Sequence, residues 1–253
     1  MKLTREEKNW ILYDVGNSAF VLLISTILPI YFNYLAQGAG LTDAQYLAYW
    51  GYAASIATII VAIMGPVMGT MADMKGIKKI LFTVTMLVGA SGCILLGFAR
   101  QWLVFLVIYI IAKVGFSSSL IFYDAMLTDV TEDKRMDEVS SYGYAWGYIG
   151  SCIPFAVSLL LVLGAEVIGL TMEQAMMISF AIVAVWWFVM TLPLLKTYRQ
   201  KHYVEKKPHA VRNGFARIGK TLANAKKQKK VFLFLIAFFF YIDGVYTIID
   251  MAT

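Results

Sequence analysis

Long apolar runs separated by short polar segments recur along the whole chain. Each run has about 20 residues or more, which is enough to cross the hydrocarbon core of a bilayer and more than a buried globular helix needs. In lipid, backbone groups must be hydrogen-bonded within the segment, and these runs are too long for barrel strands and lack their alternation. We therefore predict membrane-spanning helices at about 10–36, 45–72, 79–99, 102–127, 142–164, 172–195 and 231–253.

The expected fold is an all-α membrane protein with a six-helix bundle and the first helix of a second, truncated bundle. The composition agrees, because 60% of the residues are hydrophobic and only 15% are charged, which is more apolar than a soluble domain tolerates on its surface. Residues 1–8 are short and mixed in charge, and no small-residue cleavage site follows. We therefore expect the first apolar run to be kept and not removed as a signal peptide.

Cysteine and histidine indicate no special chemistry. Cys93 and Cys152 both fall inside predicted spans, where isolated thiols usually serve as small packing residues. His202 and His209 lie in a basic loop without cysteine or carboxylate at ligand spacing. We predict no disulfide, no metal site and no cofactor.

Basic residues indicate the orientation. Of 22 Lys and Arg residues, all but Arg100 and Lys113 lie in the amino-terminal tail or in the second, fourth and sixth connections. The positive-inside rule then places the amino terminus in the cytoplasm, and we expect a multi-pass protein of the cell membrane. The net charge of +6 sits beside membrane ends, so anionic lipid headgroups, and not nucleic acid, are its expected partner.

The longest connection divides the chain. Residues 1–195 form the expected amino-terminal bundle, 196–230 a basic cytoplasmic loop, and 231–253 the start of the second bundle. Within the loop, apolar residues recur at helical spacing among basic ones, as in a helix lying on a membrane surface; they are Phe215, Ile218, Leu222 and Ala225. A solvated linker is the equal alternative.

Ionisable side chains inside the spans are the main functional candidates, because each costs about 2.5 to 3.5 kcal/mol at the centre of a span. They belong to three polar stripes at helical spacing. The stripes are Asp14, Asn17, Ser18 and Ser25 in the first span, Lys113, Ser117 and Asp124 in the fourth, and Asp243, Thr247 and Asp250 in the seventh. Three such stripes predict one shared, wet cavity that forms the substrate pathway.

Depth separates these candidates into two levels. A rise of about 1.5 Å per residue places Lys113 and Asp243 roughly 16 to 18 Å into their spans, near the midplane, so they are plausible partners. Asp14 and Asp124 lie only about 6 Å inside the cytoplasmic edge on the same reasoning. These two line the inner mouth, or alternatively snorkel to the interface as ordinary interfacial charges.

A signature of a transporter superfamily follows the second span. The segment 69–79, with Gly69, Asp73, Gly76, Lys78 and Lys79, resembles the motif between helices two and three of the major facilitator superfamily. The resemblance implies a cytoplasmic latch in which Asp73 and the two lysines steady the outward-facing state. A carboxylate at a helix C-terminus also calls for a cationic partner. An ordinary charged turn is the alternative.

Further stretches resemble the autophagy-type vacuolar amino-acid effluxer family and its bacterial relatives. They are 13–20, 122–125, 143–148 and 241–248. The resemblance implies two six-helix bundles related by a pseudo-twofold, with helices one, four and seven lining a central pathway. Val15 departs from the aromatic residue expected there, and members of the family have about twelve helices.

We therefore expect a secondary transporter for a small polar solute, with amino acids as the leading class, in which Lys113 and Asp243 match the solute's two charges. Asp14 or Asp124 is suited to carry a coupling proton as access alternates. One alternative is a cation-coupled sugar or glycoside symporter of the same superfamily. Another is a non-transporting scaffold or receptor. An intramembrane enzyme is disfavoured, because no predicted span contains a histidine or an interior glutamate.

Overall fold

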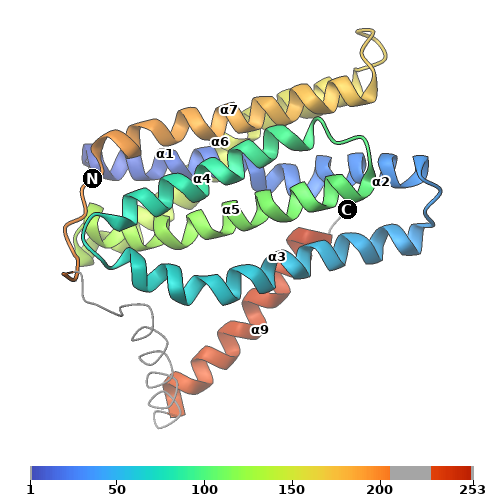
Figure 1. Ribbon diagram of the computed structural model, residues 1–253. Coiled ribbons are helices and arrows are strands. Elements are labelled where there is room, and N and C mark those ends of the chain that lie inside the picture. The colour runs from blue at the N-terminus through green and yellow to red at the C-terminus, as the bar shows by residue number, and fades with distance from the viewer. Residues whose placement is uncertain (1, 206–228, 252–253) are drawn as a thin grey trace.

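The computed structural model describes residues 2–205 and 229–251, and in the last helix the side chains of residues 243, 246 and 249–251 lie outside the description. It shows a bundle of long, roughly parallel and antiparallel helices (Figure 1). The helices are α1 (Arg5–Leu22), the π-helical turn η1 (Leu23–Ile27), α2 (Leu28–Gly38), α3 (Asp43–Ala72), α4 (Ile77–Leu96), α5 (Trp102–Val130), the short η2 (Asp133–Arg135), α6 (Met136–Leu163), α7 (Met172–Thr197) and α9 (Lys229–Met251). The prediction of an all-helical membrane protein is confirmed.

Six helices of the described part are long and apolar enough to cross a membrane, and α1, η1 and α2 together form the first of them. They coincide with the first six predicted spans to within a few residues, and α9 with the seventh. Many large apolar side chains, such as Ile63, Leu160 and Leu163, point outward and are more than half exposed, as a lipid-facing surface requires.

Local sequence explains where the helices begin. Three helices start with a capping box, in which a threonine accepts from the backbone three residues on and a Glu or Gln side chain returns the bond; the threonines are Thr4, Thr42 and Thr171. The first span widens into a π-helical turn at η1, just before Pro29. Proline lacks an N–H and crowds the preceding turn, and the wider turn accommodates that loss.

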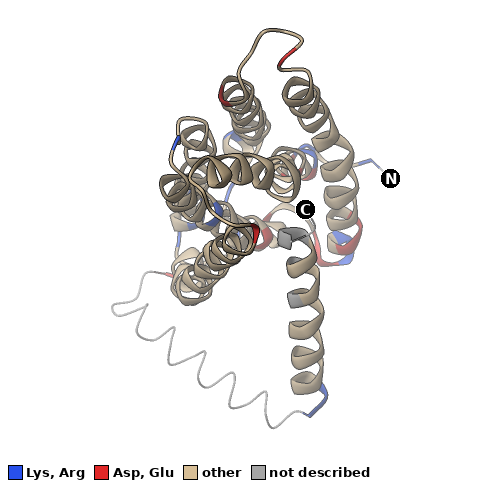
Figure 2. Cartoon of the chain, turned by 90° about the vertical axis from the view of Figure 1, so that its right-hand side faces the viewer, with Lys and Arg blue, Asp and Glu red and all other residues tan. Residues whose placement is uncertain are grey.

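Three helix pairs make the most extensive contacts of the bundle. α1 packs against α6 and α7, and α4 packs against α5. The α4–α5 contact is backbone to backbone, because a Cβ atom at Gly115 would lie 2.5 Å from the amide nitrogen of Gly89. α9 contacts η1 and α3 and stands at the side of the bundle (Figure 2).

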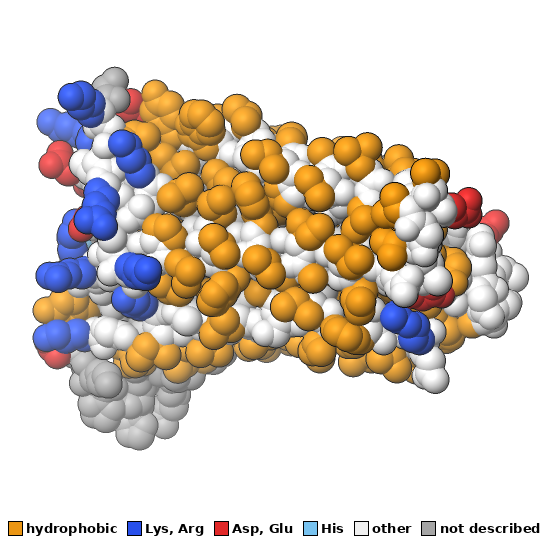
Figure 3. Space-filling model, turned by 90° about the horizontal axis from the view of Figure 1, so that it is seen from above, with side chains coloured by type: hydrophobic (Ala, Val, Ile, Leu, Met, Phe, Trp, Pro, Cys, Tyr) orange, Lys and Arg blue, Asp and Glu red, His pale blue; other side chains and the backbone are white. Residues whose placement is uncertain are grey.

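Charge separates the two ends of the bundle. The amino terminus, the turns at 72–77 and 131–135, and residues 198–205 lie together at one end, where the Lys and Arg side chains gather (Figures 1 and 3). We call this the basic end. The opposite end holds the turns at 38–43, 97–102 and 164–172. The second and fourth connections and the described start of the sixth, up to residue 205, therefore lie on one side with the amino terminus, as the positions of the basic residues predicted.

Candidate functional site

A buried carboxylate lies between α1 and α6. Asp14 is only 9% exposed, and its Oδ1 accepts a hydrogen bond of 3.2 Å from the Asn17 side chain. α6 presents glycines to it. A Cβ atom at Gly147 would lie 3.2 Å from Asp14 Oδ2 and 2.9 Å from Ser18 Oγ, so the missing side chain is what leaves room for the polar groups of α1.

Aromatic residues enclose this carboxylate on the α5 side. The Trp10 ring stacks on Tyr123 with centroids 4.2 Å apart, and its indole N–H donates to the Tyr123 carbonyl at 3.0 Å. Tyr13 packs against the same ring, at 4.6 Å between centroids, and shares a 2.6 Å hydrogen bond with Ser119. The first turns of α1 are thereby fixed against α5, which holds Asp14 in place.

The Tyr123 hydroxyl lies near Asp14, across the space that Gly143 leaves open. A Cβ atom at Gly143 would lie 3.3 Å from Asp14 Oδ2 and 3.4 Å from the Tyr123 hydroxyl, so both groups border the same small space. The hydroxyl is buried and, within the described part of the chain, has no hydrogen-bond partner. An unmatched buried hydroxyl beside a carboxylate suits a site that receives a proton, a cation or a polar ligand group.

Asp124 adds a second negative charge nearby. It follows Tyr123 on α5, and its side chain is exposed. The structure therefore brings together three predicted pathway residues of the first stripe, Asp14, Asn17 and Ser18, and Asp124 follows directly after the Tyr123 that borders them. We name this group, with Tyr123, the Asp14 cluster.

The other predicted pathway residues lie elsewhere. On α5, Ser117 and Lys113 are about 10 and 16 Å from Asp124 along the helix axis. Lys113 is buried, and its ammonium lies 5.8 Å from the centre of the Tyr109 ring. Thr247 is exposed on α9. The side chains of Asp243 and Asp250 are outside the described residues, so the expected pairing of Lys113 with Asp243 stays a prediction.

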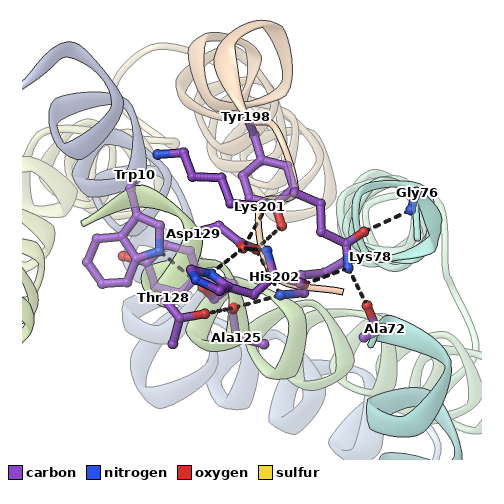
Figure 4. Close-up of polar contacts among 12 residues, drawn as sticks. Trp10, Ala72, Gly76, Lys78, Ala125, Thr128, Asp129, Tyr198, Lys201 and His202 are labelled. Atoms are coloured by element: carbon purple, nitrogen blue, oxygen red, sulfur yellow. Dashed lines mark hydrogen bonds and ion pairs between the residues drawn. The ribbon is translucent and has the colours of Figure 1, made fainter. Parts of the chain in front are cut away.

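A second polar group lies at the basic end and centres on Asp129, which sequence reasoning missed (Figure 4). The buried carboxylate accepts hydrogen bonds from the Lys78 ammonium at 2.9 Å and the Tyr198 hydroxyl at 2.5 Å. The backbone N–H groups of Lys201 and His202 donate to its other oxygen, at 3.0 and 2.7 Å. Burial, followed by this hydrogen bond, raises the pKa of Tyr198 well above its usual value.

The residues of the predicted latch lie at the basic end, and their role as a latch stays a prediction. Lys78 pairs with Asp129 and not with Asp73, whose side chain is exposed and whose backbone carbonyl accepts from the Val204 N–H at 2.7 Å. Gly76 starts α4 with a φ of 74°, a value that favours glycine, and its N–H donates to the Gln200 side chain. The motif therefore holds residues 198–204 against the ends of α3, α4 and α5. Of the other motif residues, Lys79 is half-buried on α4 and Gly69 lies near the end of α3.

Glu7 is another residue that the sequence reasoning missed. It is 1% exposed and accepts hydrogen bonds from the Thr131 hydroxyl at 2.7 Å and from Arg135 at 3.0 Å. The same side chain completes the capping box with Thr4. The position of Glu7, three residues after Thr4, predicts the capping box from the sequence alone. Its contacts with the turn at 131–135 depend on the folded structure and could not be predicted from the local sequence.

Comparisons with known proteins agree with this architecture. The profile of the family described as "Vacuole effluxer Atg22 like" matches residues 3–134 and 128–253. An uncharacterized MFS-type transporter of Bacillus subtilis (strain 168), YxiO, is 42% identical over 257 residues, covering all of this chain and 60% of that protein. Autophagy-related protein 22-1 of Penicillium rubens is 30% identical over 127 residues, 46% of this chain and 21% of the fungal protein.

The chain spans well under two thirds of the length of both relatives. The family match nevertheless extends over almost every residue, including both motif regions at 13–20 and 241–248. With the helical bundle, these findings identify a member of a transporter family with the fold of the major facilitator superfamily. The chain belongs to the Atg22-like vacuole effluxer family.

Proposed function

We propose that this sequence, within a protein of the length of its relatives, forms a secondary transporter that moves a small polar solute by alternating access. Amino acids are the leading solute class. Protons couple to transport through Asp14. The family membership supports the transporter assignment, and the Asp14 cluster is the observation that supports proton coupling.

The argument for a proton starts from the surroundings of Asp14. Among the described residues, no Lys, Arg or His forms an ion pair with it, and its hydrogen bond comes from a neutral amide. An isolated, ionised carboxylate away from water is costly unless it is paired. Binding a proton removes that cost, and access to water restores the charge. A group with these properties is suited to load and release a proton as the two halves of a carrier rock.

The solute site in this proposal lies deeper, at Lys113 and Asp243. Lys113 is a buried cation near the middle of α5, where it is suited to bind a carboxylate. Asp243 supplies the opposite charge from the seventh span, so the pair matches a zwitterion. The basic end is proposed to face the cytoplasm of the cell, in contact with anionic headgroups, as the positive-inside rule requires.

The test uses the full-length protein in liposomes with labelled amino acids and an imposed pH gradient. Asp14→Asn should abolish gradient-driven movement, while Asp43→Asn, an exposed acid at the opposite end, should leave it unchanged. Gradient-driven movement by Asp14→Asn at the wild-type rate would refute the proton role. Labelled sugars that move with sodium, in place of amino acids, would establish the glycoside symporter instead.

A further inference from the structure

A cavity of about 820 Å³ lies at the end of the bundle opposite to the basic end. It is formed by the last turn of α2, the turn between α4 and α5, and the first turn of α7, and its polar and aromatic walls include Tyr34, Gln37, Arg100, Trp102 and Glu173. Its volume is within the range of small-molecule sites. It is far from the Asp14 cluster, since Tyr34 is 20 residues further along the first span.

The cavity carries one positive and one negative side chain. Arg100 is the basic residue of this end, and Glu173 lies in the first turn of α7, next to the Thr171 capping box. The right-hand end of Figure 3 carries both blue and red side chains. In the described part of the chain the two do not form an ion pair with each other. Opposite charges therefore border one cavity without neutralising each other directly.

Two stacked tyrosines keep these charges apart. The Tyr31 and Tyr34 rings are 6.0 Å apart with an interplanar angle of 12°. Arg100 NH1 donates to the Tyr31 hydroxyl at 3.0 Å and to the Gly97 carbonyl at 2.8 Å. The Tyr34 hydroxyl donates to Glu173. Each charge is thus held by its own tyrosine.

Both charged groups can form further hydrogen bonds with a ligand. A guanidinium has five N–H donors, and the hydrogen bonds that Arg100 makes to described residues all come from NH1. The donors on NH2 and Nε remain for an anion, and a carboxylate is the anion that the fork of a guanidinium matches best. Glu173 accepts from Tyr34 through Oε1, and because the two oxygens of a carboxylate together accept about four hydrogen bonds, it has capacity for an ammonium.

We propose that this cavity is a second binding site, specific for zwitterionic solutes that carry a carboxylate and an ammonium. Arg100 binds the carboxylate, Glu173 binds the ammonium, and Tyr34 and Trp102 contact the apolar part. The choice of an amino acid as the ligand rests on the proposed transport function. The cavity lies at the end opposite to the basic end, and we call it the vestibule.

The experiment measures equilibrium binding to the full-length protein in lipid nanodiscs with three probes. Phenylalanine carries both charges, phenylalaninamide lacks the carboxylate, and N-acetylphenylalanine lacks the ammonium. Wild type should bind phenylalanine about tenfold more tightly than either single-charge probe, since each loses one charge-assisted contact. Equal binding of all three probes, or no saturable binding of phenylalanine, overturns the proposal.

Two substitutions assign the charges. Arg100→Gln should bind phenylalanine and phenylalaninamide equally, but still prefer phenylalanine over N-acetylphenylalanine. Glu173→Gln should bind phenylalanine and N-acetylphenylalanine equally, but still prefer phenylalanine over phenylalaninamide. A general loss of structure would not produce these opposite patterns. Glu166→Gln is the control, since Glu166 is exposed in the turn before α7 and does not line the cavity. Unchanged preferences in both cavity variants would overturn the assignment.

The same binding assay distinguishes a lipid headgroup from a solute, and binding from transport. A phosphatidylethanolamine headgroup carries the same pair of charges as a zwitterionic solute. If discs with this lipid abolish phenylalanine binding that discs of phosphatidylglycerol alone allow, the headgroup is the ligand and the solute proposal fails.

Asp14→Asn should bind phenylalanine with unchanged probe preferences while transport is lost. Binding without transport in wild type would refute the proposed function alone, and transport without charge-selective binding would refute only the vestibule.

Discussion

The Lys78 ammonium lies 2.9 Å from the Asp129 carboxylate, and the two side chains are only 4% and 0% exposed. The pair joins the start of α4 to the end of α5. It also fixes the segment that follows α7, because Asp129 binds Tyr198 and two backbone N–H groups of that segment. One carboxylate therefore joins α4, α5 and the segment after α7 at the basic end.

Substituting one partner of this pair should lower the stability of the folded protein. We expect Lys78→Met to lower the free energy of unfolding by about 3 kcal/mol, because it leaves a buried carboxylate without its cation. Thermal unfolding of the full-length protein in detergent measures the loss. Adding Asp129→Asn should recover part of it, since no unpaired charge then remains.

The control is a nearby exposed pair. The Lys75 ammonium lies 3.8 Å from Glu205, with side chains 57% and 75% exposed, and Lys75→Met should change stability by less than about 1 kcal/mol. Equal, small effects of Lys78→Met and Lys75→Met would show that the buried pair does not hold the basic end together.

Tyr198 gives a pH-dependent prediction. Its pKa is raised in the folded protein by burial and by Asp129, so its contribution to stability is complete below the unfolded value of about 10 and is lost as the pH rises through the folded value. We expect wild type to melt at a higher temperature than Tyr198→Phe between about pH 7 and 9, with the difference shrinking above about pH 10. A difference that grows in alkali would contradict the burial of this hydroxyl.

Two neighbouring glutamates should respond differently to the same change. Glu7 is buried and binds Thr131 and Arg135, whereas the Glu6 pair with Lys201 has side chains 40% and 52% exposed. We expect Glu7→Gln to lower the free energy of unfolding by about 2 kcal/mol, as loss of buried charge-assisted hydrogen bonds does. Glu6→Gln should change it by less than about 1 kcal/mol. Limited proteolysis at 131–135 should be faster in the first variant only.

The sequence predicted the spans because their signal is local: an apolar run of sufficient length crosses a membrane whatever it packs against. Asp14, Asn17 and Ser18 were found for the same reason, since a polar stripe on one helix can be read from spacing alone. Their neighbour Tyr123 lies in one of the stretches that resemble the family, at 122–125, but a tyrosine in an apolar helix has no spacing pattern that marks it as part of a site.

Asp129 could not be predicted, and the reason is distance along the chain. Its partners Lys78, Tyr198 and Lys201 are 51, 69 and 72 residues away, on separate elements that only the folded bundle brings together. Arg100 was visible as a basic residue on the less charged side, but its relation to Glu173 depends on where α2 and α4 end and where α7 begins. Both groups require tertiary structure to be recognised.

The last prediction concerns the glycines of α6. Substituting them distinguishes a role in helix packing from a role in the polar site beside Asp14. A Cβ atom at Gly147 would approach Ser18 Oγ to 2.9 Å and Asp14 Oδ2 to 3.2 Å, whereas at Gly65 on α3 it would meet only the Ile121 side chain, at an ordinary contact distance of 3.5 Å. Gly147→Ala should therefore cost about 1 to 3 kcal/mol by overpacking and reduce transport, since α6 must move away from the carboxylate. Gly65→Ala should leave transport unchanged, and its stability effect should be within about 1 kcal/mol, the size of the Gly-to-Ala difference in a helix. If Gly147→Ala transports at the wild-type rate with wild-type stability, the close contact between α6 and Asp14 has no role in the cycle. If stability is kept but transport is lost, the space beside Asp14 itself is what the substrate or the proton requires.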